Sequence, residues 1–301
     1  MPKPHVLVIG SLNMDLVSYS DRIPHVGETV LGQRFATVPG GKGANQAMAA
    51  VKLGAKVTML GAVGNDSYGD QLLSHLKQHG VDTTRVLRTG STTGVALINV
   101  DANGNNQIVV VPGANYDLGP AELVRRQQVF ADADVVVLQL EIPLPTVGQA
   151  IELAHKYHKP VILNPAPAQP LPDDWLNQVD YLIPNEHEAL LLAGSEENFY
   201  VALRQKMKHT LIVTRGEKGV TFMHQNQLVS VPAFMVQAVD TTAAGDAFIG
   251  GFSVALAEGL GLPEAIRFGC AVAALSVTKE GAQTSLPLRQ EVEHFMGGLK
   301  Q

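Results

Sequence analysis

Short apolar runs alternate with segments of helical period along most of the chain. The runs are bounded by turn residues and predict buried strands, over Val6–Ile9, Val57–Leu60, Val135–Leu138, Pro160–Leu163, Tyr181–Ile183 and Leu211–Val213. The segments between and after them predict helices, over Ala44–Leu53, Tyr68–Gln78, Pro145–Tyr157, Glu186–Leu192, Phe199–Lys206, Pro263–Lys279 and Leu288–Met296. Buried strands that alternate with helices are typical of an α/β fold with a mainly parallel sheet covered on both faces.

Two stretches interrupt this alternation. Leu16–Pro39 contains strand-like alternating pieces without a helix signal, and Gly94–Val111 has two apolar runs around the hairpin signal Asn103-Gly104. Together they predict a small antiparallel sheet inserted into the α/β body, which would act as a lid or a dimer face. The alternative is an edge extension of the main sheet. We expect one domain over residues 1–301, with the lid formed by segments of about 13–40 and 94–112.

Composition excludes several classes of protein. Lys and Arg number 22 against 28 Asp and Glu, a net charge of −6, which argues against nucleic acid as the main partner. Cys270 is the only cysteine, so no internal disulfide is expected and a reducing cytoplasm is favoured. The N-terminal apolar run is too short for a signal peptide or a membrane span, and no membrane partner is expected.

The stretch Val239–Gly251, VDTTAAGDAFIGG, predicts the start of a helix that begins near Ala244 and ends at Gly259. Backbone N–H groups at a helix start have no intrahelical partner and suit an anion. Asp246 lies in the same first turn, where a carboxylate could take a proton from a hydroxyl that attacks a phosphoryl group. The alternative is that Asp240 and Asp246 are an ordinary N-cap and a first-turn acid.

The sequence PGGKGANQA, Pro39–Ala47, is similar to two phosphate-binding loops but matches neither. Gly43 stands where a P-loop has Ser or Thr. Gln46 stands where the dinucleotide fingerprint has Gly or Ala, and no strand is predicted before it. What remains is a Gly-rich turn into a helix, with Lys42 and Asn45 as donors suited to a polyhydroxylated ligand. A flexible turn is the alternative.

Polar residues follow several predicted strands, at the edge where open α/β sheets bind ligands. They are Asn13 and Asp15 after the first strand, Glu141 after Val135–Leu138, and Asn164 after Pro160–Leu163. A single acid at such a place is usually a cap, whereas several polar residues at successive strand ends indicate a binding crevice.

Two further motifs are candidates for a nucleotide site. Asn185 and Glu188 share one face of a helical turn, where amide and carboxylate oxygens suit Mg²⁺ or form a capping box. Thr214–Gly219, TRGEKG, opens a Gly-rich turn that could accept an adenine ribose or phosphate, or be a plain hairpin.

Taken in order, the motifs NMD, GGKGAN, GxVGxD (Gly61–Asp66), NxxE, TxGxxG and DTTxAGD resemble the ribokinase family of carbohydrate kinases, also called the PfkB type. The resemblance covers nearly the whole chain. It implies a doubly wound, mainly parallel α/β fold with a small β-sheet lid, and a homodimer formed through the lids. It also implies a kinase that uses ATP and Mg²⁺ and is activated by a monovalent cation, usually K⁺.

The resemblance assigns roles residue by residue. Asp246 would be the base that deprotonates the sugar hydroxyl, and the N–H groups of Ala243, Ala244, Gly245 and Asp246 would form the anion hole. The sugar would contact Asn13, Asp15, Gly41, Lys42, Asn45, Glu141 and Asp246. The nucleotide would contact Asn185, Thr214, Gly216, Gly219, Gly245 and Cys270. Asn185 and Glu188 would hold Mg²⁺, partly through water, and the K⁺ ligands would come from Asp240, Thr242, Ser276, Lys279, Gly281 and Ser285.

Two positions depart from the family pattern. Many members have Gly where this chain has Ala243, and Ala is tolerated there unless φ is positive. Cys270 stands where some members place a larger polar residue near the adenine, which leaves the nucleotide preference open.

The motifs NMD and GGKGAN, with Glu141, favour a pentose, so we expect phosphorylation of the 5-hydroxyl of D-ribose to D-ribose 5-phosphate with release of ADP. The alternatives are a kinase of the same family for deoxyribose, fructose, a ketodeoxygluconate or a nucleoside, and a catalytically silent sugar-binding protein. A nicotinamide-dependent oxidoreductase is disfavoured by the incomplete fingerprint.

Overall fold

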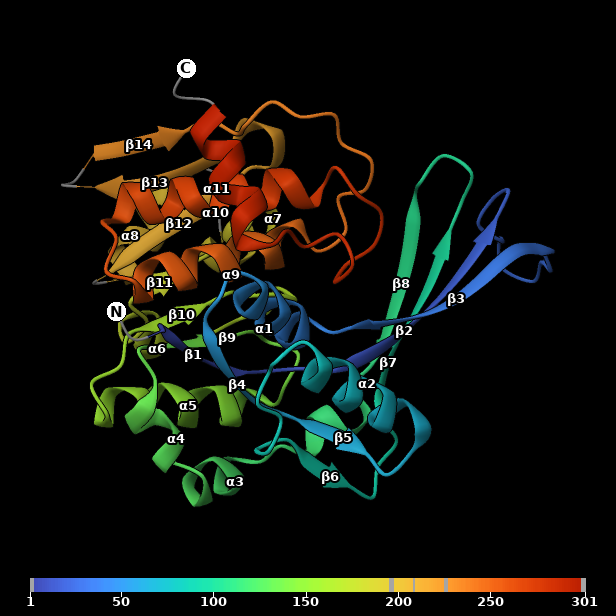
Figure 1. The fold of residues 1–301 in the computed structure, drawn as a ribbon, viewed down its shortest axis with the longest axis horizontal. Helices are drawn as coiled ribbons and strands as arrows, with labels where there is room; N and C mark the ends of the chain where they lie inside the picture. The colour runs from blue at the N-terminus through green and yellow to red at the C-terminus, as the bar shows by residue number, and fades with distance from the viewer. Residues whose placement is uncertain (1–2, 195–197, 208, 225–226, 299–301) are drawn as a thin grey trace.

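A central eight-stranded sheet organises the structure, a computed structural model that describes residues 3–194, 198–207, 209–224 and 227–298 (Figure 1). In spatial order the strands are β14 (Gln227–Val231), β13 (Val220–His224), β12 (Thr210–Thr214), β11 (Tyr181–Leu182), β10 (Val161–Leu163), β9 (Val135–Leu138), β1 (His5–Ile9) and β4 (Lys56–Leu60). Neighbouring strands from β12 to β4 are parallel, and β13 and β14 extend the sheet as an antiparallel edge. Residues 1–2 and 299–301 of the predicted domain lie outside the described residues.

Helices cover both faces of this sheet because side chains alternate along each strand. Val6 and Val8 of β1 pack in one core with α1 (Lys42–Lys52), α2 (Ser67–Gln78), α9 (Ala244–Ala257), α10 (Leu262–Ser276) and α11 (Arg289–Gly298). Leu7 and Ile9 pack in the opposite core with α3 (Pro120–Arg125), α4 (Gln128–Asp132), α5 (Leu144–Lys156), α6 (Asp173–Leu176), α7 (Glu186–Ala193) and α8 (Phe199–Lys206). The doubly wound α/β architecture is therefore confirmed.

The strands and helices predicted from the apolar pattern are all present, with ends that shift by three residues or fewer. The elements not predicted are short or lie at the edge of the sheet: β5 (Ala62–Gly64), β6 (Leu87–Thr89), β13, β14, α3, α4, α6 and the 3₁₀ turns η1 (Gly113–Asp117) and η2 (Gly216–Lys218). Among the described residues, no helix combines the length and the apolar character needed to cross a membrane.

A separate four-stranded sheet, called here the small sheet, projects from the body (Figure 1). Its strands, in spatial order, are β3 (Gly32–Gly40), β2 (Asn13–Ser20), β7 (Gly94–Val100) and β8 (Asn106–Val111). The alternative of an edge extension of the main sheet is therefore wrong. The expectation of a purely antiparallel sheet is also wrong, because β2 pairs with β7 in parallel. Between these two strands the chain passes through β3, α1, β4, β5, α2 and β6, and it re-enters the small sheet from the same end.

Two local features of the small sheet differ in how well the sequence predicts them. The hairpin between β7 and β8 turns at Asn103-Gly104 as predicted, and Asp101 Oδ1 accepts from the N–H groups of Asn103 and Asn105, at 2.9 Å each. The expectation that no strand precedes the GGKGAN motif is wrong, because β3 runs to Gly40. The Gly-rich turn thus joins the small sheet directly to α1.

Candidate functional site

The predicted site residues gather at the carboxyl ends of the central strands. Asn13 and Asp15 follow β1 and begin β2, Glu141 follows β9, Asn164 follows β10, and Asn185 follows β11. The helix α9 begins at the same edge, since Ala244, Gly245 and Asp246 line one cavity together with Asn164 and Asn185. This edge of an open α/β sheet is where ligand crevices form.

The start of α9 presents backbone N–H groups to this crevice. Gly245 is exposed, and within the described part of the chain no side chain caps the helix. The N–H of Ala244 donates to the carbonyl of Thr241 (3.2 Å), so it is engaged in a turn. Ala243 has φ 58° and ψ 16°, a left-handed conformation that favours glycine. The condition for tolerating Ala at this position is therefore not met, and Ala243 is locally strained.

The Asp246 carboxylate is only 6% exposed and is held by two side chains of α1. Asn45 Nδ2 donates to Oδ2 (3.0 Å), and Gln46 Nε2 donates to Oδ1 (2.9 Å). Each oxygen retains a lone pair, because a carboxylate oxygen accepts up to two hydrogen bonds. The geometry leaves Asp246 able to accept a proton from a hydroxyl group placed beside it.

Glu141, one of the predicted sugar contacts, is held by three hydrogen-bond donors. Glu141 Oε2 accepts from the Ser11 hydroxyl (2.5 Å), the Lys42 backbone N–H (3.2 Å) and Asn13 Nδ2 (3.4 Å). Three donors fix one oxygen of Glu141 and leave the other for hydroxyl groups of a ligand.

Charges in this region shift the pKa values of Asp15 and Lys42. Burial, followed by the charges of Glu141 and Asp246, raises the pKa of Asp15 to about 7. Burial alone would lower the pKa of Lys42, but the carboxylates of Asp246, Glu141 and Glu188 outweigh it and raise that pKa. The arrangement is three carboxylates around one ammonium group, a set that suits several hydroxyl groups.

Gly41 joins the small sheet to α1 in a conformation that requires glycine. Its φ is 89°, and a Cβ added there would lie 2.7 Å from the backbone nitrogen of Asn13. This close approach brings the start of α1, with Lys42 and Asn45, next to the start of β2, with Asn13 and Asp15.

A polar cavity of about 220 Å³ lies at the start of α9. Its lining includes Lys42, Asn185, Glu188 and Asp246. Asn185 and Glu188 form a reciprocal capping box, with the Asn185 side chain accepting from the Glu188 N–H and the Glu188 side chain accepting from the Asn185 N–H, at 2.8 Å each. Burial raises the pKa of Glu188 despite this bond and the nearby Lys42 charge. Amide and carboxylate oxygens on a polar wall are ligands that suit Mg²⁺ held through its own waters.

An apolar cavity of about 490 Å³ adjoins the polar one. Thr214, Gly216, Gly219 and Cys270 all line it, beside Phe234 and Phe248 and other apolar side chains. Burial raises the pKa of the Cys270 thiol to about 12, so Cys270 contributes an apolar wall and not a nucleophile. The TRGEKG turn is both the connection between β12 and β13 and part of this wall, so the two interpretations of that motif are compatible.

The predicted cation ligands lie on two adjacent segments. Asp240 accepts from the backbone N–H groups of Thr242 (2.9 Å) and Gly281 (2.8 Å), and the Val239 N–H donates to the Val277 carbonyl (2.7 Å). Ser276 and Ser285 bond to carbonyls within their own turns, and Lys279 pairs with Glu291. Among the described residues, no three His, Cys, Asp or Glu side chains cluster as metal ligands. A cation here would depend on backbone carbonyls.

Several residues of the site were missed at the level of sequence. Ser11 and Gln139 are polar residues just beyond the ends of apolar strand runs, which is a weak signal. At Gln46 the sequence shows only a mismatch to the dinucleotide fingerprint. Gln283 lies in a loop with no recognisable pattern, yet its Nε2 donates to Asn45 Oδ1 (3.0 Å).

Comparisons with known proteins identify the family of this chain. The model of the pfkB family of carbohydrate kinases matches residues 3–289. Ribokinases of Bacillus subtilis and Haemophilus influenzae are 46% and 43% identical, over 97% and 96% of this chain and 99% and 97% of their own length. A deoxyribokinase of Salmonella typhimurium is 40% identical over 97% of this chain and 98% of its own length.

Solved structures show the same fold. The crystal structure of ribokinase from Thermotoga maritima has a TM-score of 0.90 and 38% identity, and covers 98% of this chain and 99% of that chain. A structure of Arabidopsis thaliana ribokinase complexed with ribose and ATP has a TM-score of 0.90 at 32% identity, with the same coverage. With a family match over nearly all its length, this chain belongs to the pfkB family of carbohydrate kinases.

Proposed function

We propose that this chain transfers the γ-phosphoryl group of MgATP to the 5-hydroxyl of D-ribose, giving D-ribose 5-phosphate and ADP. The observation that carries the proposal is the position of Asp246. Its charge acts on Asp15, which with Glu141 belongs to the sugar side, and it lines the polar cavity, which shares Thr214, Thr241, Ala244 and Gly245 with the apolar cavity. That order suits a sugar, a phosphate chain and an adenine in one line.

Each part of the chain has a defined task in this reaction. Asp246 accepts the proton of the 5-hydroxyl as that oxygen attacks the γ-phosphorus, and the bond to the bridging oxygen of ADP breaks. Backbone N–H groups at the start of α9 and the ammonium group of Lys42 offset the charge on the transferring phosphoryl group. Asn185 and Glu188 would hold Mg²⁺, which neutralises phosphate charge when bound.

Three finer proposals concern conditions and assembly. The carbonyl groups near Asp240 and Gly281 would bind K⁺, which would order the segment before α9. The small sheet would cover the sugar and exclude water, limiting hydrolysis of ATP. With a single cysteine the chain forms no internal disulfide, and we infer that it works in the cytoplasm.

We also infer a homodimer through the small sheet. Its edge strand β8 exposes Ile108, Val109, Val110 and Val111, which alternate between the two faces. An exposed apolar edge strand favours association with another chain. A second copy that covers both faces of β8 would remove this surface from water.

The test is ADP release from MgATP with D-ribose, 2-deoxyribose, fructose, a ketodeoxygluconate and adenosine, each in K⁺ and in Na⁺. Fastest turnover on D-ribose, raised by K⁺, supports the sugar site and the cation segment together. Fastest turnover on 2-deoxyribose, the sugar named for the Salmonella relative, would refute the choice of pentose but retain the role of Asp246. Sugar binding without ADP formation would indicate a catalytically silent protein.

A further inference from the structure

Asp246 lies at the centre of a row of buried side chains, called here the amide row: Gln139, Gln46, Asp246, Asn45 and Gln283. All five are less than 9% exposed. The row connects β9, α1, α9 and the loop before α11. Apart from Asp246, its members have carboxamide side chains, which donate and accept hydrogen bonds but do not titrate.

The row has a fixed polarity. An ionised carboxylate only accepts hydrogen bonds, so Asn45 and Gln46 must turn their N–H groups toward Asp246. Their own oxygens then point away and accept from Gln283 Nε2 (3.0 Å) and Gln139 Nε2 (2.6 Å). Every donor in the row therefore points toward Asp246, whose carboxylate accepts from Asn45 and Gln46.

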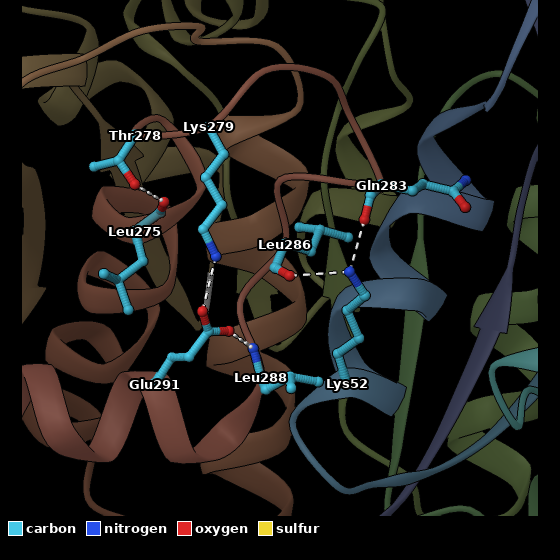
Figure 2. A network of polar contacts seen from close by, with 8 residues as sticks. All are labelled: Lys52, Leu275, Thr278, Lys279, Gln283, Leu286, Leu288 and Glu291. Atoms are coloured by element: carbon cyan, nitrogen blue, oxygen red, sulfur yellow. Dashed lines mark hydrogen bonds and ion pairs between the residues drawn. The ribbon is translucent and has the colours of Figure 1, made fainter.

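The two outer ends of the amide row, Gln139 and Gln283, differ in their surroundings. At one end the Gln139 oxygen Oε1 has no hydrogen-bond partner among the described residues, and a Cβ added at Gly10 would come within 1.8 Å of it. Gln283 Oε1 at the other end also lacks a hydrogen-bond partner among the described residues, and an unpaired buried acceptor is destabilising. At the other end, Lys52 Nζ binds the carbonyls of Gln283 (2.9 Å) and Leu286 (3.0 Å), as Figure 2 shows.

Gln46 has the clearest positioning geometry in the row. Its Nε2 donates to Asp246 Oδ1 (2.9 Å) and lies 3.3 Å from Asn164 Oδ1, so both of its N–H groups have acceptors. Gln46 is 1% exposed and is absent from the described lining of both cavities. Its effect on the reaction is therefore indirect, through Asp246 and through Asn164 of the polar cavity, whereas Asn45 also belongs to the expected sugar contacts.

We propose that Gln46 is a positioning residue that fixes the orientation and the ionised state of the Asp246 carboxylate, with Gln139 fixing Gln46 in turn. The inference rests on the proposed function, because Asp246 has to accept a proton only if the chain transfers a phosphoryl group to a sugar hydroxyl. The other charged groups near Asp246 are Lys42, Asp15 and Glu188, and a substitution of Gln46 leaves all three in place.

The first test compares Gln46→Met with Gln46→Glu. Met has a similar length but no donor, whereas Glu keeps an acceptor for Gln139 and places a second acid against Asp246. Losing a hydrogen bond to a charged group changes an equilibrium by about tenfold or more. We expect kcat to fall about tenfold at neutral pH in Gln46→Met, with the acidic limb of the kcat–pH profile moved to higher pH. In Gln46→Glu the same limb moves further, because two adjacent acids share a proton.

A structural role would give a different pattern. KM for the sugar and for ATP should stay within about twofold, since Gln46 lines neither cavity. Gln169→Met is the matched control, because the Gln169 amide donates to the Leu140 carbonyl (3.3 Å) and the row does not include it. A wild-type kcat and pH profile in Gln46→Met overturns the proposal. So does a lower kcat with an unchanged pH profile that follows the loss of folded protein.

A second measurement does not depend on turnover. In protein labelled with ¹³C at aspartate carboxyl carbons, the Asp246 signal is the one missing from Asp246→Asn. Its titration midpoint should rise by about one pH unit in Gln46→Met, and an unchanged midpoint overturns the proposal. If the wild-type chain phosphorylates none of the sugars, the proposed function fails, while this titration still decides the role of Gln46. Gln139→Leu, which frees Gln46 without touching Asp246, should raise the midpoint by less.

Discussion

Gly250 of α9 lies so close to Ala49 of α1 that a methyl group added at Gly250 would come 2.3 Å from the Ala49 Cβ. Gly250 is one helical turn beyond Asp246, and Ala49 is one turn beyond Asn45. Residues four apart share a helix face, so this contact sets the distance at which Asn45 and Gln46 reach the Asp246 carboxylate. Because Gly250 has no side chain, α9 can lie close enough to α1 for these two side chains to reach Asp246.

The first prediction concerns Gly250→Ala. The added methyl has no flexible neighbour to displace, so α1 and α9 must separate, at a cost of about 1–3 kcal/mol in the free energy of unfolding. We expect a lower melting temperature and a lower kcat, because the bonds to Asp246 lengthen. Gly297→Ala, in a helix with open space around the added Cβ, is the control and should lower neither. Wild-type kcat in Gly250→Ala would contradict this view of the helix contact.

The second prediction concerns Asp246→Asn. An amide of the same size cannot take the hydroxyl proton, so kcat should fall by at least about 100-fold. Binding of the sugar should change much less, because Asn45 and the carboxylates of Asp15 and Glu141 remain. Single-turnover ADP formation and a separate sugar titration measure the two effects. Near-normal turnover would remove Asp246 as the base.

The third prediction is a pH dependence set by Asp15. Its pKa is raised to about 7, and sugar hydroxyl groups donate hydrogen bonds to the ionised form. Sugar affinity should therefore rise with pH through about 7 and level off above it, with protons released on binding. Calorimetry in buffers on both sides of this pKa tests it. Asp15→Asn should bind weakly at every pH, and a flat wild-type profile would refute the assignment.

The same shift affects the protein without sugar. An acid whose pKa is raised in the folded state stabilises the fold fully below its ordinary value of 3.8 and loses that contribution as pH rises through about 7. Urea unfolding at stepped pH should show this loss in the wild-type chain, and a smaller one in Asp15→Asn.

The fourth prediction uses the left-handed conformation of Ala243. Glycine adopts φ near 58° without the Cβ clash, so Ala243→Gly should stabilise the fold by up to about 1 kcal/mol. Activity should persist, since the backbone N–H is retained. Ala257→Gly, at the right-handed end of the same helix, should instead destabilise by about 0.5–1 kcal/mol. Equal effects of the two substitutions would show that Ala243 is not strained.

The fifth prediction tests the dimer. Ile108 and Val109 lie on opposite faces of β8, and Val109 is 61% exposed. A buried charge opposes association, so Ile108→Glu or Val109→Glu should yield a monomer by light scattering. Val201→Glu, an exposed apolar position on α8, is the control. A wild-type chain that is monomeric at all concentrations would refute the inference.

The main sheet and the principal site motifs follow from the sequence because each depends on local patterns. Val6 to Ile9 must be buried on both faces, and Asp246 in a small-residue helix start has a recognisable spacing. The parallel pairing of β2 with β7 depends on how distant segments meet, and no local pattern encodes it. The short edge strands β13 and β14 are equally weak in sequence.

The amide row escaped prediction for a related reason. Gln46, Gln139 and Gln283 lie on three elements far apart in sequence, and a lone glutamine is usually a surface residue. Only the fold shows that all three are buried and connected. Gln46 donates to the Asp246 carboxylate, Gln139 donates to Gln46, and Gln283 donates to Asn45. The strain at Ala243 could be recognised only from its backbone angle. The sequence shows that Ala is unfavourable if φ is positive, and the structure gives φ as 58°.

The small sheet begins at the residues expected to hold the sugar: Asn13 and Asp15 stand at the root of β2, and Gly41 and Lys42 follow directly from β3. In the proposed sugar site, movement of the sheet would move those residues, and a bound sugar would restrain the sheet. Binding free energies are reciprocal. A partner that binds the far end of β8 in its sugar-bound position would raise the affinity for sugar. The sugar would raise the affinity for that partner by the same factor. In the proposed dimer, the small sheet would therefore couple sugar binding to the association of the two chains.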